Sequence, residues 1–346
     1  MVVFWVVKYS QNEDVSAISY VSYEDQMEIG YPEMSICITM PFIYQNLSLN
    51  LNINVSANEY NQYLNGNTTF REEYRSIDYN NVTLNLLDHV QEIILSGRNK
   101  TAATDLRCKE PQDCPYVKFR SNFNGVSKGT TIRCFGFEKD RKRNEKVMAL
   151  TVIFKPGLKE MLNKVAENDL GQSSLSFNYP GQLLKSAANW LPIWKKPNDS
   201  LTLVAIKVSA MEILRRRNKH SDSCLLDWAC FDNMVMKNHD DNAKCKAPYQ
   251  TSNKSLCTTM TEMVDSMYNV ERMRSSDYQE PCEEMSSIVF SAEDIDISYH
   301  PQSPKLIYIY PEKTKIIQQV KSVDLQALIG NLGGYIGLFL GKNHIF

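Results

Sequence analysis

The chain has 346 residues, with 38 Lys and Arg against 40 Asp and Glu, and a formal net charge of −2. A chain of this length holds one large domain or two to three small ones, and 43% hydrophobic residues can fill a sizeable core. A mean hydropathy of −0.37 excludes a disordered tail and a multi-span membrane protein. A pI of about 6.3 argues against a nucleic-acid partner, which requires a basic surface.

Periodicity predicts the secondary-structure elements in chain order. Strands are expected over residues 31–44, 132–137, 147–154, 201–213, 286–297 and 305–310. Helices are expected over residues 84–97 with Gly97 as C-cap, 156–168 behind Pro156, 230–237 and 255–274. Residues 46–68 are rich in Asn and predict a solvated loop or a short polar helix. The order mixes helices and strands without βαβ regularity, which indicates an α+β fold.

Nine Cys and seven Asn-x-Ser/Thr sequons indicate the secretory route. Disulfides persist in oxidising compartments, and sequons receive glycans only there. Seven sequons are a mild excess over chance, so the two signals predict an extracellular domain only when taken together. The sequon asparagines are Asn46, Asn54, Asn67, Asn81, Asn99, Asn198 and Asn253.

Both ends of the sequence are apolar. Residues 1–7 form a short apolar run, and residues 325–341 carry no formal charge but include five glycines. Each run is shorter than the roughly 20 apolar residues that a spanning helix needs. One interpretation is a buried strand at the start and a buried helix at the end. The other is two membrane helices of which only the extracellular parts are present.

Three stretches carry a family resemblance. Residues 31–37 read Tyr-Pro-Glu-Met-Ser-Ile-Cys, residues 129–137 place a Gly before Cys-Phe-Gly-Phe, and residues 328–341 read Leu-Ile-Gly-Asn-Leu-Gly-Gly-Tyr-Ile-Gly-Leu-Phe-Leu-Gly. In these stretches the chain resembles the degenerin, epithelial sodium channel and acid-sensing ion channel family. The last stretch is similar to the run that opens that family's second membrane helix, and it is the most specific of the three.

The resemblance implies a hand-like, disulfide-rich α+β ectodomain with a central β palm, a helical finger and thumb, and a β-ball. Residues 1–8 would then end the first transmembrane helix, and residues 325–346 would begin a truncated second one. Residues 9–324 would form the extracellular domain, with the finger at about 46–130, the thumb at about 221–284 and palm strands between them. Tyr9 would lie at the wrist.

The resemblance also implies a disulfide framework that is thinner than the family's. Its expected pairs are Cys37 with Cys134, Cys108 with Cys114, Cys245 with Cys257, and Cys224 with Cys282. Cys230 is left over, either free or in an intermolecular bond. The pairing within the thumb stays open.

The pore is the second implied site. Gly341 aligns with the glycine of the family's Gly-x-Ser selectivity constriction, but Lys342 and Asn343 depart from that pattern. A Lys at a cation constriction repels Na⁺, so Gly341 is expected to be a remnant in a chain that does not conduct alone. Gly333, Gly334 and Gly337 belong to the same run, for which close helix packing is the simpler interpretation.

Other chemistry is weakly indicated. The adjacent carboxylates at 72–73, 240–241, 283–284 and 293–294 are usually solvated surface, so proton gating is not predicted. The family's thumb aromatic that touches the wrist is missing from residues 220–224, and the basic runs 141–143 and 215–217 are expected to be solvated turns. The five His are scattered without H-E-x-x-H, C-x-x-C or G-x-S-x-G motifs, so neither an enzyme nor a metal site is expected.

The resemblance implies a subunit or fragment of a ligand-, proton- or mechanically gated, amiloride-sensitive sodium channel at the plasma membrane, mostly extracellular. Its expected partners are related subunits in a homo- or hetero-trimer and the lipid bilayer, with no nucleic acid. No cofactor is expected besides the permeant Na⁺. The alternative is a non-conducting secreted or tethered ligand-binding glycoprotein, or a dominant-negative subunit without complete membrane helices. A third interpretation is an incomplete gene model.

Overall fold

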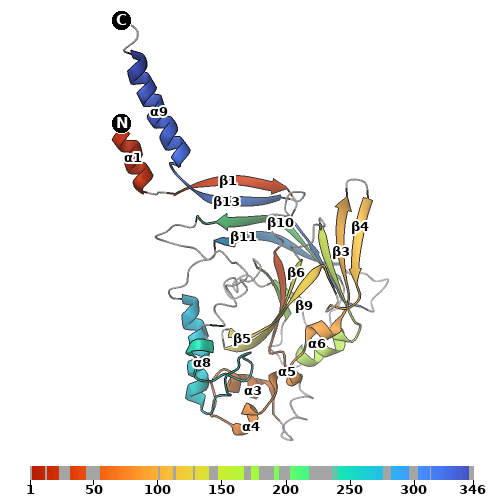
Figure 1. Cartoon of the computed structure of the whole chain (residues 1–346). Coiled ribbons are helices and arrows are strands. Elements are labelled where there is room, and N and C mark those ends of the chain that lie inside the picture. Colours follow the sequence, from red (N-terminus) through yellow and green to blue (C-terminus); the bar gives the residue numbers. More distant parts are fainter. Residues whose placement is uncertain are drawn as a thin grey trace.

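The structure is a computed structural model of mixed α and β character (Figure 1). It describes residues 2–11, 14–22, 32–43, 55–99, 102–111, 114–127, 129–139, 147–166, 173–178, 191–194, 203–217, 237, 240–275, 282–295, 303–311 and 313–342. Two β-sheets form the centre, a helical lobe lies at one end, and two helices project from the other end (Figure 1).

The larger sheet is organised around β10. Its hydrogen-bonded order is β1-β13-β10-β12-β7-β3-β4, and β11 pairs with the other edge of β10. The parallel partners of β10 share its length, because residues 203–207 pair with β12 and residues 211–215 pair with β13. The bounds are β1 Asp14–Ser22, β3 Val90–Asn99, β4 Ala102–Cys108, β7 Ala149–Phe154, β10 Leu203–Arg215, β11 Glu283–Ile295, β12 Lys305–Ile309 and β13 Lys313–Lys321.

The smaller sheet has the order β5-β6-β2-β8-β9. Its central strand β2 pairs Cys37 directly with Cys134 of β6, and the two form a disulfide. Closing a loop with a sequence separation of 97 residues stabilises the fold by about 4–5 kcal/mol in the loop-entropy model. The bounds are β2 Glu33–Thr39, β5 Val117–Ser127, β6 Thr130–Lys139, β8 Ser173–Asn178 and β9 Leu191–Trp194.

The main core lies between the two sheets and is closed by α6 (Leu158–Ala166). Both sheets contribute fully buried side chains, such as Ile36 and Phe135 from the smaller and Val152 and Ile206 from the larger. The ring of Phe177 in β8 stacks on Tyr308 in β12 with centroids 4.7 Å apart, which fixes how one sheet lies on the other.

A second core lies in a helical lobe, which we call the tyrosine lobe and define as residues 55–82 and 240–275. It contains α3 (Ala57–Leu64), α4 (Glu72–Arg75), α5 (Tyr79–Val82) and α8 (Met260–Ser275), with a disulfide between Cys245 and Cys257. Asn61 of α3 ties the lobe to the smaller sheet, because its Oδ1 accepts hydrogen bonds from the backbone N–H and the hydroxyl of Thr131 in β6. The buried aromatic residues are Phe42, Tyr60, Tyr63, Tyr74, Tyr79 and Tyr249.

The strands predicted over 31–44, 132–137, 147–154, 201–213, 286–297 and 305–310 are confirmed as β2, β6, β7, β10, β11 and β12. The helices predicted over 156–168 and 255–274 are confirmed as α6 and α8. The helix predicted over 230–237 lies almost wholly outside the described residues.

The helix predicted over 84–97 is wrong. A short 3-10 helix, Leu86–His89, leads directly into β3, so Gly97 is a strand residue and not a C-cap. The apolar spacing at 90, 93 and 95 also fits a strand once the register shift between Val90 and Glu92 is included, because such a bulge adds one residue to the alternation. β3 is then held on both edges by β4 and β7, which decides the competition in favour of the strand.

Of residues 46–68 the structure describes 55–68, where α3 confirms the short helix, but one face of that helix is buried and not solvated. In α3 the side chains of Tyr60 and Tyr63 are fully buried against Tyr74, so this segment forms the centre of the tyrosine lobe. The predicted short helix is therefore present, and only its solvated character is wrong on this face, because the Asn content hid an aromatic pair spaced three residues apart.

The packing of α3 against α8 depends on Gly66. Its φ of +72° suits glycine, and a Cβ built there would lie 2.3 Å from Cγ2 of Val264 in α8. Gly129 also has a positive φ of +76°, but a Cβ there would meet no described atom within 4 Å. A side chain at Gly66 would therefore meet both backbone strain and steric overlap, whereas a side chain at Gly129 would meet backbone strain alone.

We expect Gly66→Ala to lower the free energy of unfolding by about 2–4 kcal/mol, through backbone strain and overpacking. Gly129→Ala is the control and should cost about 1–2 kcal/mol from strain alone. In a Val264→Ala background the penalty of Gly66→Ala should fall to that of the control. Denaturant unfolding measures the stability of the two glycine variants, of Val264→Ala and of Gly66→Ala combined with Val264→Ala. An equal cost for Gly66→Ala and Gly129→Ala would refute the close contact.

Candidate functional site

The two projecting helices leave the molecule at the same place. α1 (Val2–Gln11) precedes β1 and α9 (Leu325–Lys342) follows β13. β1 and β13 are antiparallel from Asp14 opposite Lys321 to Ser22 opposite Lys313, which puts the start of one beside the end of the other. The helices therefore run out side by side, away from the tyrosine lobe (Figure 1).

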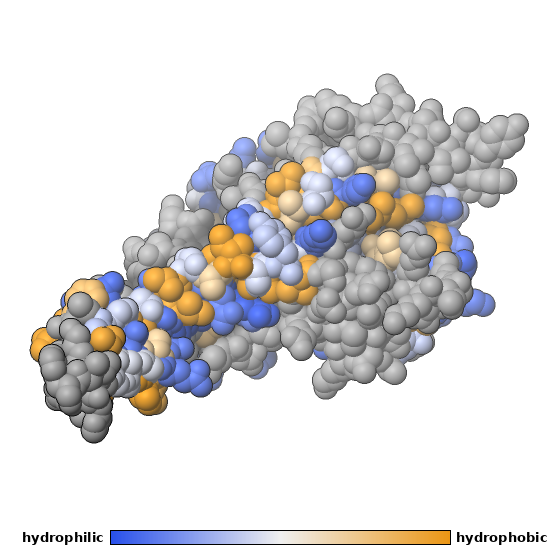
Figure 2. Space-filling view, turned by 90° about the horizontal axis from the view of Figure 1, so that it is seen from above, coloured by the Kyte–Doolittle hydropathy of each residue, from blue (hydrophilic) through white to orange (hydrophobic). Residues whose placement is uncertain are grey.

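Both helices present large apolar side chains to the outside. Val3 of α1 is 73% exposed and Leu338 of α9 is 64% exposed. Figure 2 shows hydrophobic side chains on this end of the molecule and along the neighbouring strands. Of the helices formed by described residues, none reaches the length and apolarity that crossing a membrane requires. The other exposed apolar residues of this end are Phe4, Val6, Val7, Val15, Ile18, Tyr20, Leu325, Ile329 and Ile336.

The glycines of the predicted pore lie on α9. A Cβ built at Gly333, Gly334 or Gly337 would meet no described atom within 4 Å, so these positions have open space beside them. Gly341 is in the last turn of the same helix. Among the described residues, close packing against another helix therefore does not explain the glycines at 333, 334 and 337.

Tyr9 lies where α1 joins the sheet. The ammonium nitrogen of Lys321, at the end of β13, is 3.2 Å from the centroid of the Tyr9 ring. A cation over an aromatic face is attracted by the ring quadrupole. Three residues further on, the Asp324 carboxylate accepts a hydrogen bond of 2.6 Å from the backbone N–H of Ala327 and caps α9. The short stretch from Lys321, the last residue of β13, to Asp324 thus contacts both helices.

The arginine run 215–217 is paired instead of forming a solvated turn. Arg215 lies 2.9 Å from Glu283, Arg216 pairs with Glu284, and Arg217 lies 2.8 Å from Asp14. Two adjacent carboxylates of the predicted set are therefore ion-pair partners. Sequence reasoning missed this cluster because its members come from three strands that are distant along the chain.

A further ion pair joins β10 to β13. Nζ of Lys315 lies 2.7 Å from Oε1 of Glu212, its neighbour in the parallel register. The hydrogen bond from Lys315 holds the pKa of the Glu212 carboxyl below its usual range, and the same bond raises the pKa of Lys315. Both residues are therefore charged at neutral pH, and their attraction stabilises the pairing of β13 with β10.

An open cleft of about 680 Å³ lies on the tyrosine lobe between α5 and residues 246–256. Its lining is mostly polar and includes two carboxylates and one lysine. The lining includes Asp78, Tyr79, Asp240, Lys246, Gln250 and Asn253. Asp240 belongs to a predicted carboxylate pair, and Asn253 is a sequon asparagine with an exposed side chain. A glycan on Asn253 would therefore stand at the edge of the cleft.

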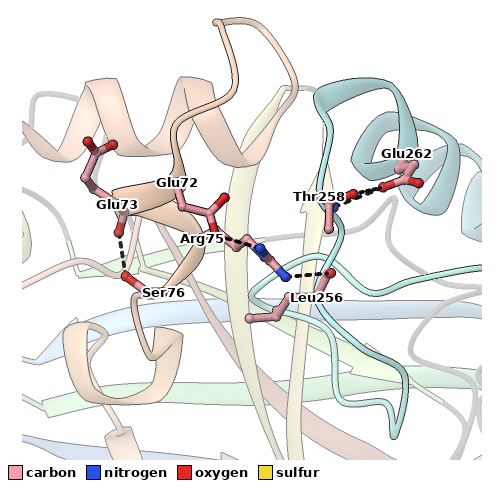
Figure 3. A network of polar contacts seen from close by, with 7 residues as sticks. All are labelled: Glu72, Glu73, Arg75, Ser76, Leu256, Thr258 and Glu262. Atoms are coloured by element: carbon pink, nitrogen blue, oxygen red, sulfur yellow. Dashed lines mark hydrogen bonds and ion pairs between the residues drawn. The ribbon is translucent and has the colours of Figure 1, made fainter.

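A polar network joins the two chain segments of the lobe next to this cleft (Figure 3). Arg75 pairs with Glu72 at 2.6 Å within α4 and donates a longer hydrogen bond, 3.5 Å, to the backbone carbonyl of Leu256. On the facing segment, the carboxylate of Glu262 accepts hydrogen bonds from the N–H and the hydroxyl of Thr258. The hydroxyl of Thr259 caps α8 by accepting a hydrogen bond from the N–H of Glu262. Glu72 is thus engaged in a structural contact.

The remaining predicted residues are placed as follows. Disulfides join Cys37 to Cys134, Cys108 to Cys114, and Cys245 to Cys257, and Cys282 is disulfide-bonded as well. Cys224 and Cys230 lie outside the described residues, as do Asn46, Asn54 and Asn198. Asn67 and Asn81 have exposed side chains, and Asn99 ends β3. Among the described residues, no group of three or more His, Cys, Asp and Glu is arranged to hold a metal ion.

The buried tyrosines of the lobe make it lose stability at alkaline pH. Burial raises the pKa of Tyr63 to about 12, and burial also raises the pKa values of Tyr60 and Tyr79. Unfolded tyrosines lose their proton near pH 10. Between about pH 10 and 12 the unfolded chain therefore binds fewer protons than the folded chain, and stability falls as the pH rises.

We expect Tyr63→Phe to flatten this alkaline loss of stability. The Tyr63 hydroxyl has no hydrogen-bond partner among the described residues, so the change should cost little at pH 7. Unfolding in denaturant at several pH values from 7 to 12 measures it. Tyr20→Phe, at a position 69% exposed, is the control. If both variants show the wild-type pH dependence, the account of the tyrosine core is wrong.

Comparisons with known proteins do not show the family. No family model matches the chain, and no curated protein matches it. Among solved structures, the cryo-EM structure of a proton-activated chloride channel is similar to this chain at 8% sequence identity and a TM-score of 0.21. The match covers 99% of this chain and 88% of the chloride channel chain. A likeness of that size carries no argument about fold or function.

Proposed function

We propose that this chain is a subunit, or part of a subunit, of a sodium-selective channel of the degenerin, epithelial sodium channel and acid-sensing ion channel family. The observation that carries the proposal is the exit of α1 and α9 side by side from one end of the sheet, both with exposed apolar surfaces. Such an arrangement suits an ectodomain that stands on a membrane with both chain ends directed into it.

The positions of the three family-like stretches support the proposal. Residues 31–37 run into β2 and residues 129–137 lie in β6, and these two strands are hydrogen-bonded neighbours joined by the Cys37–Cys134 disulfide. Residues 328–341 lie in α9. Stretches chosen from sequence alone thus fall on two bonded core strands and on one of the two exposed helices.

The proposal assigns parts of the fold to the family's anatomy. The two sheets are the palm and β-ball, and the tyrosine lobe is the contact between finger and thumb. Tyr9 and Lys321 are at the wrist. We further propose that the chain assembles as a homo- or hetero-trimer with related subunits, stands mostly outside the plasma membrane, carries N-linked glycans, passes Na⁺ through the assembled pore, and has no enzymatic role.

A second candidate function is a non-conducting ligand-binding glycoprotein, secreted or tethered. The open polar cleft next to the exposed sequon Asn253 favours it, because such a cleft serves ligand binding without any pore. The two proposals differ in whether α1 and α9 contact lipid.

The test is co-expression with a full-length sodium channel of this family, with voltage-clamp recording and carbonate extraction of membranes. We expect the chain to stay with the membrane and to change the amiloride-sensitive sodium current. Ile336→Asp on α9 should abolish both effects, because a charge in the bilayer costs about 2.5–3.5 kcal/mol.

The matched control is Val289→Asp, which changes a similarly exposed apolar residue on β11 (58%, against 57% for Ile336). It should behave as the unaltered chain. Release into the medium with no effect on the current would refute the channel proposal and support the ligand-binding glycoprotein.

A further inference from the structure

Asp14 is the centre of a set of charged contacts at the base of α1. Its Oδ1 lies 2.8 Å from Nη2 of Arg217, at the end of β10. On its other side, Asp14 is the register partner of Lys321, whose ammonium lies over the ring of Tyr9. Asp14, three positions after the end of α1, therefore pairs with a charged residue that follows β10 and lies opposite a charged residue of β13.

The neighbouring arginine continues this set toward a disulfide. The backbone N–H of Arg216 donates a hydrogen bond of 2.7 Å to the carbonyl oxygen of Cys282, which is itself disulfide-bonded. The Arg216 guanidinium pairs with Glu284, and the two side chains are only 17% and 13% exposed. Because Arg216 and Arg217 share a peptide bond, the segment at Cys282 and the segment at Asp14 are fixed to one short stretch of backbone.

These pairs differ from ordinary surface ion pairs. The side chains of Arg217 and Asp14 are 22% and 16% exposed, so water and salt screen their attraction less than at a fully exposed site. The Arg216–Glu284 pair is in addition a hydrogen bond between ionised groups, which is the stronger class of hydrogen bond. Removing the charge of Asp14 would leave the partly buried Arg217 guanidinium without this carboxylate partner.

We propose that Arg216, Arg217 and Asp14 are positioning residues, which form an electrostatic link between the disulfide-bonded Cys282 segment and α1. The link runs from Cys282 to Arg216 by a backbone hydrogen bond, through the peptide bond to Arg217, and by an ion pair to Asp14. From Asp14 it continues through the backbone pairing of β1 with β13 to Lys321, whose ammonium lies over Tyr9. A displacement of the Cys282 segment moves α1 through this link. Its use in gating rests on the proposed function, whereas the link itself does not.

The test is hydrogen exchange, followed by mass spectrometry, on the full glycosylated chain in detergent micelles. In Asp14→Asn we expect the amides of residues 14–18 in β1 to exchange about tenfold faster, because the variant loses a partly buried ion pair. Glu284→Gln, which acts on the same amides only through Arg216, should change them in the same direction by a smaller factor.

Glu283→Gln is the matched control. Glu283 is adjacent to Glu284 and pairs with Arg215, and this pair joins only β10 to β11. It should leave the exchange of residues 14–18 unchanged. Unchanged exchange in β7 and β12 of every variant shows that the fold is intact.

The charge swap Asp14→Arg with Arg217→Asp should restore slow exchange that Asp14→Arg alone loses. The proposal is overturned if Asp14→Asn leaves residues 14–18 unchanged, or if Glu283→Gln accelerates them as much as Glu284→Gln does. None of these readouts uses a current, so failure of the link and failure of the channel proposal are separate results.

Discussion

The parallel pairing of β10 with two successive strands is the constraint on which the rest of the structure depends. One end of β10 bonds to β12 and thereby joins the main core, while the other end bonds to β13. Among the described strands, β13 is the one partner of β1, and α1 and α9 continue from these two strands. The backbone pairing between the helix-bearing strands and the core therefore runs through β13, while the Arg217–Asp14 ion pair joins β1 directly to the residues after β10. A movement of that end of β10 therefore reaches both helices.

The two ends of the molecule are stabilised by different forces. The tyrosine lobe has a buried aromatic core, a close contact at Gly66 and its own disulfide. At the helix-bearing end, most side chains of β1 are exposed, so little apolar area is buried there. That end is instead held by backbone hydrogen bonds of the β1–β13 ladder and by ion pairs around Asp14. Charged contacts thus have the largest effect where apolar burial is smallest.

Local patterns predicted the strands of the core, because alternating apolar residues such as those of β2 and β7 leave little choice of structure. The same reasoning failed over 84–97, where apolar residues fit a helical and a bulged strand period equally well and pairing with β7 decided the outcome. It also missed β1, where most side chains are exposed, and β13, and the pairing of these two strands joins segments from opposite ends of the sequence. The Arg217–Asp14 contact depends on that pairing, so no local pattern indicates it.

The disulfides show what resemblance adds to local patterns. Spacing alone does not select a partner for Cys37 97 residues away, whereas the family-like stretches around Cys37 and Cys134 do. The cleft of the tyrosine lobe had no such signal, because its walls come from segments more than 150 residues apart that only the fold brings together. Candidate sites at such junctions need coordinates before they are visible.

The central claim is that α1 and α9 stand together in a membrane as parts of a trimeric assembly. A cryo-EM reconstruction of the full chain in lipid nanodiscs tests it most directly. The account predicts three copies around one axis, with α1 and α9 of each copy inside the lipid density and the tyrosine lobe distant from it. A single copy with both helices outside the lipid would contradict it.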